Sequence, residues 1–242
     1  MKLSKIGWCD CTLNPITGCK NFDRPGICGT YCYAARMAKR FHRSFEPAFH
    51  PERLQQLKRM RGNGKIVFLD SAADWFCEGV QPEWVHKILD TIDGVPQHHF
   101  LVLTKRPERI LDALHCRDLP QNLWLGVSVT CQEDMWRISA LKEAIPQTTK
   151  RFISFEPLHG PINLGSFGGV DWIIIGAETG NSKDKIVPKV QWITDLIAQV
   201  PSDIPIFIKQ NVYETISWTE IGDYEQFPET LLYAEWKEGR WQ

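Results

Sequence analysis

The chain has 242 residues, of which 43% are hydrophobic and 24% are charged, and its formal net charge is −1. This composition is ordinary for a soluble protein, and the length is sufficient for a full core without disulfide bonds. Because the net charge is close to zero, the protein is not broadly basic. Any contact with nucleic acid therefore has to use a local positive patch.

The first residues, "MKLSKIGWCDC", lack the apolar region of a secretory signal, and the longest apolar run, "WIIIGA", is too short to cross a bilayer. We therefore expect a cytoplasmic protein with no membrane partner. Thiols stay reduced in that compartment, so grouped cysteines are expected to bind metal or take part in catalysis rather than form disulfides.

Seven short runs rich in β-branched and aromatic residues predict strands, at 8–13, 65–70, 99–104, 123–129, 151–156, 171–176 and 204–209. They are apolar on both faces, as is typical of parallel strands covered by helices. Between them, amphipathic stretches predict helices, at 33–43, 51–61, 82–92, 107–115, 132–145 and 188–200. The Gly- and Pro-rich segment 157–170 is expected to be a loop.

This alternation of strands and helices predicts βα units in a single domain that spans residues 1–242. Seven strands favour a full or partial (β/α) barrel of the TIM type. An open doubly wound sheet is the alternative, although no G-x-G-x-x-G motif follows any strand. Residues 212–242 are expected to form a C-terminal appendage.

Polar residues follow most of the predicted strands. They are Asp70 and Ser71, Thr104 to Arg106, Ser128 and Thr130, Glu156, Gly176 to Glu178, and Lys209 and Gln210. In a barrel these positions share the carboxyl-end face, where barrel enzymes build their active sites. The sequence therefore predicts an active-site mouth at this face.

Cys19, Cys28 and Cys32 lie close together between the first predicted strand and the first predicted helix. Three thiolates can hold three corners of an iron–sulfur cluster or three of the four positions around zinc. A closed zinc site needs a fourth ligand, for which the nearby candidates are Cys9, Cys11 and His42. The remaining cysteines stand alone and are expected to be small buried apolar side chains: Cys77, Cys116 and Cys131.

Several segments, in order along the chain, resemble one family: "LNPITGC" (13–19), "CYAARMAKR" (32–40), "LTKRPER" (103–109), "WLGVSV" (124–129), "FEPLHGPI" (155–162), "IIIGAETG" (173–180) and "IFIKQ" (206–210). They resemble the phage Gp37/Gp68 family, a radical-SAM-like group named for its three-cysteine motif. Radical S-adenosylmethionine (SAM) enzymes usually carry C-x3-C-x2-C, and this chain departs from that spacing with C-x8-C-x3-C.

The resemblance implies a radical SAM barrel in which Cys19, Cys28 and Cys32 hold a [4Fe–4S] cluster whose fourth iron chelates SAM. A donor such as flavodoxin or ferredoxin would reduce the cluster, and cleavage of SAM would give a 5′-deoxyadenosyl radical. The residues implied to bind SAM are Tyr33, Asp70, Ser71, Ser128, Glu156, Gly176, Ala177 and Glu178.

Four further polar residues at the mouth are the candidates for substrate binding: Lys105, Arg106, Lys209 and Gln210. Cations at a mouth suit a phosphate or a carboxylate. The alternative is that they pair with carboxylates inside the barrel, at Asp70, Glu156 and Glu178. The basic residues of the first predicted helix are candidates for contact with a phosphate backbone: Arg36, Lys39, Arg40 and Arg43.

The resemblance implies a DNA or nucleotide substrate, in the host cytoplasm if the protein is encoded by a phage. The leading hypothesis is isomerisation or rearrangement of a hypermodified thymidine that protects DNA from restriction. Base repair by a radical SAM lyase is one alternative. Another is a metal-dependent nuclease or hydrolase that uses Asp70, Asp74, Glu156 and Glu178, with zinc on the cysteines. A third is a nucleic-acid-binding module with a zinc clamp and an inert barrel.

Overall fold

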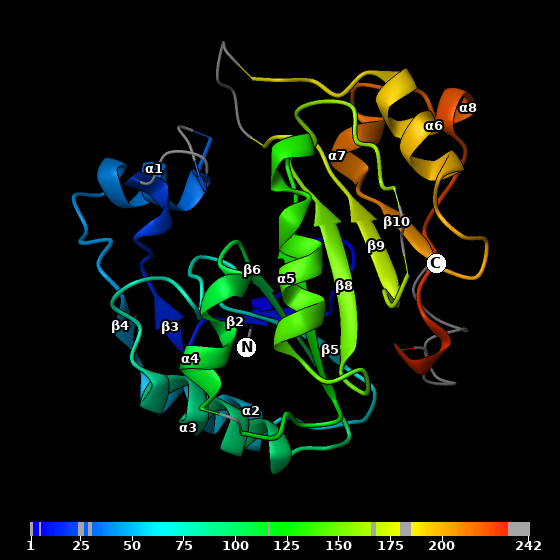
Figure 1. Ribbon diagram of the computed structural model, residues 1–242. Helices are drawn as coiled ribbons and strands as arrows, with labels where there is room; N and C mark the ends of the chain where they lie inside the picture. Colours follow the sequence, from blue (N-terminus) through cyan, green and yellow to red (C-terminus); the bar gives the residue numbers. More distant parts are fainter. Residues whose placement is uncertain are drawn as a thin grey trace.

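The computed structural model describes residues 2–4, 6–23, 27–28, 31–115, 117–165, 168–179 and 185–231. Its main sheet has the spatial strand order β1-β2-β5-β6-β7-β8-β9-β10 (Figure 1). The strands are β1 (Lys2–Leu3), β2 (Cys11–Leu13), β5 (Ile66–Leu69), β6 (His99–Thr104), β7 (Leu123–Ser128), β8 (Lys150–Phe155), β9 (Trp172–Ile175) and β10 (Ile206–Ile208). The strands from β2 onward run parallel, and β1 pairs antiparallel with β2.

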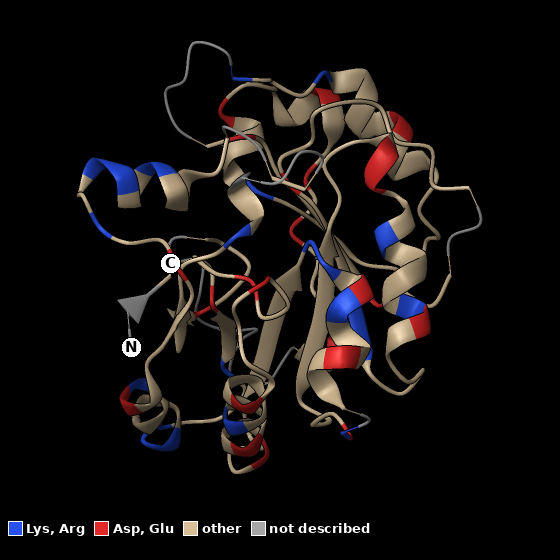
Figure 2. Cartoon of the chain, turned by 60° about the vertical axis from the view of Figure 1, so that its left-hand side comes forward, with Lys and Arg blue, Asp and Glu red and all other residues tan. Residues whose placement is uncertain are grey.

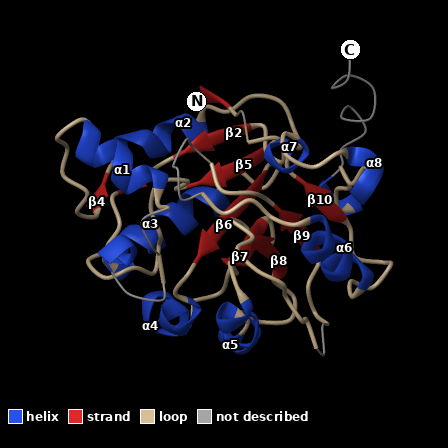
Figure 3. Ribbon diagram, turned by 90° about the horizontal axis from the view of Figure 1, so that it is seen from above, coloured by secondary structure: helices blue, strands red, loops and turns tan. Residues whose placement is uncertain are grey.

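The sheet curls into a half-barrel, and within the described ranges no strand pairing joins β10 to β1 or β2. Four helices follow its convex side (Figure 3): α3 (Pro82–Asp93), α4 (Ile110–Leu114), α5 (Trp136–Ala144) and α6 (Val190–Ala198). All seven predicted strands are confirmed, and the barrel is partial. The doubly wound alternative is wrong, because these crossover helices cover one face of the sheet and not both.

The other two predicted helices are also confirmed, as α1 (Tyr33–Arg40) and α2 (Leu54–Lys58). α2 follows a short 3-10 turn that begins at Pro51, where proline needs no hydrogen-bonded N–H. α1 buries none of its side chains and lies apart from the sheet at the left of Figure 1. None of the helices in the described ranges has the length and hydropathy needed to cross a bilayer.

The sheet separates two apolar clusters, because alternate residues of a strand point to opposite faces. The cluster between the sheet and the helices is mostly aliphatic. The cluster on the concave face is mostly aromatic and contains Trp8, Phe68, Trp124, Phe152 and Trp172. The ring centroids of Trp8 and Phe68 lie 4.7 Å apart, so aromatic contacts fill the base of the half-barrel.

Some short elements were not predicted, because two-residue strands and one-turn helices show no periodicity. β3 (Ile16–Thr17) and β4 (Ala48–Phe49) form a small antiparallel ribbon beside the sheet. α7 (Gln210–Tyr213) and α8 (Trp218–Ile221) follow β10.

The described part of the predicted appendage packs against the end of the sheet. Glu225 forms an antiparallel bridge with Phe207, and the carbonyl of Gln226 accepts a hydrogen bond from Trp172 Nε1 at 3.0 Å. Leu231 is buried in the aromatic cluster. The chain therefore covers the β10 edge as far as this residue, and 232–242 lie outside the described residues.

Two histidines at the amino end of β6 predict a pH-dependent stability. Burial lowers the pKa of His98 and His99 below the ordinary value of 6.5. As the pH falls below that value, the unfolded chain takes up protons that the folded chain does not, so stability falls. We expect His98→Gln to lose less of its free energy of unfolding than the wild type between pH 8 and about 5.5, measured by urea denaturation.

The matched control is His42→Asn, because His42 is exposed and asparagine tolerates its positive φ. An unchanged pH dependence in the His98 variant, or an equal change in the control, would contradict the assignment.

Candidate functional site

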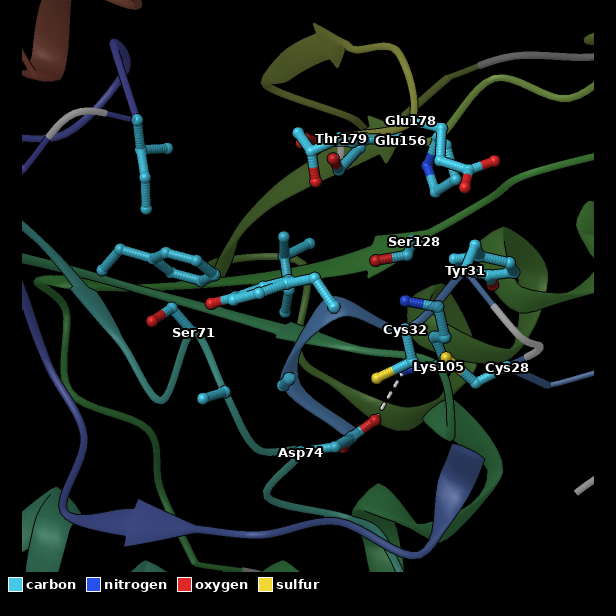
Figure 4. A pocket seen from close by; sticks show the side chains of 18 of the residues that line it. Cys28, Tyr31, Cys32, Ser71, Asp74, Lys105, Ser128, Glu156, Glu178 and Thr179 are labelled. Atoms are coloured by element: carbon cyan, nitrogen blue, oxygen red, sulfur yellow. Dashed lines mark hydrogen bonds between the residues drawn. The ribbon is translucent and has the colours of Figure 1, made fainter. Parts of the chain in front are cut away.

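A cavity of about 590 Å3 opens at the carboxyl ends of the parallel strands. Most of the predicted site residues line it: Cys19, Cys28, Cys32, Tyr33, Asp70, Ser71, Lys105, Ser128, Glu156, Ala177, Glu178, Lys209 and Gln210. Figure 4 shows the labelled side chains around it, with Cys28 and Cys32 on one side and Ser71 on the other. The strand ends thus meet at one mouth, as the sequence predicts, and Gly176 and Arg106 are absent from its lining.

The polarity of the cavity follows from the strands that form it. On β7 the concave face presents Trp124 at the base and Ser128 at the rim, and on β8 it presents Phe152 and then Ser154. Each strand therefore changes from aromatic to small and polar towards its carboxyl end. The Ser154 hydroxyl is buried without a hydrogen-bond partner in the described structure and lines the cavity, a site residue that the sequence analysis missed.

Asp70 is a structural carboxylate at the wall of this cavity. One of its oxygens accepts a hydrogen bond from the Ile16 amide at 2.7 Å, and the other accepts one from Trp75 Nε1 at 2.5 Å. Burial raises the pKa of Asp70 to about 8, against the effect of these bonds. Asp70 lines the cavity while each of its oxygens accepts one hydrogen bond from the protein, so its implied contact with SAM stays a prediction.

Asp74 joins the cysteine loop to the ends of β5 and β6. Its Oδ2 accepts hydrogen bonds from Asn21 Nδ2 at 2.7 Å and from the Lys105 amide at 2.9 Å. Its Oδ1 accepts from the Thr104 hydroxyl at 2.7 Å and from the Phe76 amide at 3.0 Å. Because Asn21 lies two residues after Cys19, this buried carboxylate fixes where the cysteine loop meets the mouth.

Gly18 allows the same loop to pass close to its neighbour. It has a φ of +79°, and a Cβ at this position would lie 2.2 Å from the Glu46 carbonyl oxygen. The next residue, Cys19, donates its amide to the Phe45 carbonyl at 2.9 Å. Only glycine has both the conformation and the space that this approach requires.

Glu156 and Lys209 form an ion pair at the rim, which confirms for Lys209 the alternative of pairing inside the barrel. Gly176 lies beneath this pair, because an added Cβ would be 2.9 Å from carbon atoms of Glu156 and 3.0 Å from Lys209 Cδ. The implied part of Gly176 in binding SAM stays a prediction, since the residue is absent from the cavity lining. Its missing side chain makes room for the ion pair.

The two neighbouring cations of β6 have different positions. Arg106 is buried outside the cavity lining and pairs with Glu108 at 2.5 Å, so it does not fit the predicted substrate contact. Lys105 lines the cavity, and the described residues give its ammonium group no ion pair or hydrogen bond. Its positive charge also acts on Cys32. Lys105 is therefore the cation most available to a ligand.

The three grouped cysteines share the cavity but not a single point within it. Cys19 lies close enough to Cys77, and Cys28 close enough to Cys32, for the two members of each pair to interact. These contacts, with burial, raise the pKa of Cys19 and of Cys32. Within the described ranges no three His, Cys, Asp or Glu side chains are grouped to hold a metal ion. As arranged here, the thiols do not fit the three corners of one cluster.

Two tyrosines connect the cysteine loop to the rest of the mouth. Burial and the neighbouring Cys28 raise the pKa of Tyr31, and its ring meets that of His159 edge-on at 5.1 Å. His159 Nε2 lies 3.4 Å from Glu178 Oε2. Tyr33, which is implied to bind SAM, lines the cavity, and burial raises the pKa of its hydroxyl.

α1 forms a basic and aromatic surface beside the mouth (Figure 2). Tyr33, Met37 and Phe41 are 50%, 44% and 52% exposed, and they repeat every four residues on one side of the helix. Arg40 and Arg43 lie over the Phe41 ring at 5.7 and 5.6 Å. No acidic residue occurs between 31 and 45. We call residues 33–43 the basic arm.

A contact across the mouth holds the basic arm in place. Arg36, one of the predicted phosphate contacts, instead donates to the carbonyls of Tyr31 and Thr179, each at 3.2 Å. Thr179 follows β9 and lines the cavity. The cysteine loop and the β9 loop are thereby joined through one guanidinium group.

The comparisons with known proteins identify the family of the chain. A family model described as "Protein of unknown function (DUF5131)" matches residues 3–225. The chain belongs to this family. No curated protein and no solved structure matches it. The description of the family assigns no activity, so a function for the DUF5131 chain has to be argued from the cavity itself.

The hydrogen bonds of Asp74 predict the effect of an isosteric change. Asp74→Asn places an NH2 group against donors that now meet a carboxylate oxygen. We expect it to lower the free energy of unfolding by about 1–3 kcal/mol, because a buried donor loses its acceptor. Chemical denaturation measures the change, with exposed Asp112→Asn as the matched control. A variant as stable as the wild type would show that these hydrogen bonds do not anchor the loop.

Proposed function

We propose that the protein is a radical SAM enzyme that modifies a base of DNA, most specifically by isomerisation or rearrangement of a hypermodified thymidine. The observation that carries the proposal is the shared cavity. Cys19, Cys28 and Cys32 come from a single loop after β2 and line the same space as the polar ends of the parallel strands. Active sites of βα barrels are built at this face.

The size and chemistry of the cavity suit SAM. Its volume of about 590 Å3 lies within the range of small-molecule sites. SAM carries an ammonium group, a carboxylate, a ribose and an adenine, so its site needs charges of both signs as well as hydroxyl and apolar groups. Glu156 and Lys105 supply the charges, Ser71 and Ser128 supply hydroxyls, and the aromatic base supplies an apolar floor.

The cofactor set of the proposal is a [4Fe–4S] cluster with SAM, and its partner is a one-electron donor such as flavodoxin or ferredoxin. The positions of the three thiols determine whether they can bind such a cluster. Cys19 would have to come closer to Cys28 and Cys32 before all three could bind one cluster, because the described residues hold no such group of three side chains. The role of the chain itself is to bind SAM, to orient the substrate and to exclude water from the concave base.

The basic arm supports a nucleic-acid substrate. Exposed aromatic rings beside arginines bind single strands by stacking on bases and by neutralising phosphates. A base inside a duplex cannot reach the floor of the cavity, so the target must be in a single strand or be flipped out, which costs about a few kcal/mol. Tyr33 belongs to both the arm and the cavity lining, so it marks a path from one to the other.

The metal-dependent hydrolase alternative has less support from the carboxylates. Asp70 and Asp74 already accept hydrogen bonds from the protein at both oxygens, and Glu156 pairs with Lys209. Breaking these contacts to bind divalent ions would leave buried donors and an ammonium group without partners. A radical SAM lyase for base repair would use the same cavity and differs from the leading proposal in its product.

Iron loading tests the ligand set. We expect Cys19→Ala, Cys28→Ala and Cys32→Ala each to lose iron and sulfide after anaerobic reconstitution, because each removes a thiolate ligand. Cys131→Ala is the matched control and should load as the wild type does. Iron and sulfide analysis, together with calorimetry of SAM binding to the loaded protein, measures the outcome.

Full iron loading in all three variants would overturn the ligand assignment. Stoichiometric zinc without iron would favour a structural metal site. Loaded protein that does not bind SAM would refute the proposed reaction class.

Salt dependence tests the role of the basic arm. We expect Arg40→Gln with Arg43→Gln to weaken binding of single-stranded DNA and to reduce the slope of log K against log salt by about 0.7 for each phosphate that is no longer neutralised. Fluorescence anisotropy of a labelled oligonucleotide measures both quantities. The charge-matched control is Lys58→Gln with Arg59→Gln on exposed positions around the end of α2, away from the mouth. Equal weakening in both double variants would show that the arm has no specific part in binding.

A further inference from the structure

Two polar atoms at the aromatic base of the cavity are buried without a partner. Trp8 and Ser154 are 1% and 0% exposed, and both residues line the cavity. Neither the indole Nε1 of Trp8 nor the hydroxyl of Ser154 has a hydrogen-bond partner in the described structure. A buried polar group without a partner costs stability, so native proteins contain few of them and each has a specific reason.

The fold places both groups on the concave side of the sheet. The Trp8 ring lies 4.7 Å from that of Phe68 and 6.2 Å from that of Phe152, measured between ring centroids, so aromatic contacts restrict rotation of the indole. Ser154 lies two residues after Phe152 on β8 and is therefore on the same face of the sheet. Trp8 and Ser154 are thus neighbours of the same phenyl ring.

A second hydroxyl lies beside that of Ser154. Ser128 of β7 pairs in register with Ser154 of β8, is 5% exposed and lines the cavity (Figure 4). Phe68 and Leu103 add apolar surface to the same lining. We call the following five residues the Trp8 pocket: Trp8, Phe68, Leu103, Ser128 and Ser154.

The chemistry of the Trp8 pocket fits a flat ring with hydrogen-bonding atoms at its edge. Its aromatic and aliphatic side chains can contact the faces of such a ring. The indole N–H can only donate, whereas a serine hydroxyl can donate and accept. The complementary edge therefore carries at least one acceptor, such as a carbonyl oxygen or a ring nitrogen. None of the five residues is charged, so a charged group would find no ion-pair partner among them.

We propose that the Trp8 pocket binds a nucleobase, with Trp8 Nε1 donating to an acceptor at the edge of the base and the serine hydroxyls completing its hydrogen bonds. The proposal deepens the proposed function and rests on it, because that function supplies two molecules with such a ring, the target nucleoside and SAM. Lys105 and Glu156 follow the ends of β6 and β8, and they meet the charged parts of the same molecules.

The unpartnered hydroxyl allows ligand binding to be separated from stability. Ser154→Ala removes a hydroxyl that has no hydrogen bond to lose, so we expect it to melt no lower than the wild type. Thr130→Val is the contrasting control, because Thr130 is buried outside the cavity lining and its hydroxyl donates to Asp134 at 2.7 Å. We expect Thr130→Val to melt lower and to keep the ligand affinity of the wild type.

Calorimetry of the metal-free protein measures the binding of two probes, thymidine and 5′-deoxyadenosine. We expect Ser154→Ala to weaken binding of at least one probe about three- to tenfold, which corresponds to the net contribution of one hydrogen bond. Weaker thymidine binding identifies the target base as the occupant, and weaker binding of 5′-deoxyadenosine alone identifies the adenine of SAM. Difluorotoluene deoxyriboside, which has the shape of thymidine without its carbonyl and N–H groups, should bind weakly and equally to wild type and Ser154→Ala.

Trp8→Phe is the second variant, because it keeps an aromatic ring and removes the N–H group. Equal affinities for both probes in the wild type, Ser154→Ala and Trp8→Phe would overturn the proposal, as would a wild type that binds neither probe. Iron analysis separates the pocket from the reaction class. Protein that loads iron and binds SAM, but loses no probe affinity in these variants, refutes the pocket alone. Protein whose probe affinity depends on Ser154 but which never loads iron supports the pocket and refutes the radical SAM reaction.

Discussion

The buried carboxylate of Asp74 is the contact on which the mouth of this half-barrel depends. Its two oxygens accept four hydrogen bonds that tie the cysteine loop to the ends of β5 and β6. A carboxylate suits this position because it is acceptor-only, whereas an amide would present a donor to one of its partners. Asp70 anchors the β3–β4 ribbon in a similar way, because it accepts a hydrogen bond from the Ile16 amide. Two acidic residues of the cavity lining therefore hold its wall together, Asp70 and Asp74.

The fold could be predicted because apolar strand segments and amphipathic helix segments alternate regularly along the chain. Each of the seven runs, such as 99–104, is apolar on both faces, and this identifies parallel strands covered by helices. The lining of the mouth could be predicted as well, since residues that follow parallel strands share one edge, as Ser71, Ser128 and Glu156 do. Short elements such as the β3–β4 ribbon could not be predicted, because a two-residue strand is too short to show a repeating pattern of apolar residues.

The contacts inside the mouth could not be predicted, because they depend on residues distant in the sequence. The neighbouring strands decide whether a cation at a strand end faces a ligand or a carboxylate. Lys209 therefore pairs with a carboxylate, whereas Lys105 faces the cavity. The same holds for Asp74, which is 53 positions from Asn21 in the sequence and accepts a hydrogen bond from it in the fold. The role of Gly176 could not be predicted either, because its missing side chain leaves room for the ion pair between Glu156 and Lys209, which follow two other strands.

The basic arm connects the two sides of the mouth. Because α1 buries none of its side chains, it has no apolar face to fix it against the sheet. Its position rests instead on the hydrogen bond that Arg36 donates to the Thr179 carbonyl at 3.2 Å. This contact is polar and exposed, so it contributes little stability and can exchange for a contact with a ligand. A molecule that enters the cavity therefore meets a helix without a buried face, and that helix follows directly from Cys32. Any displacement of the arm would be transmitted to this thiol through the chain itself.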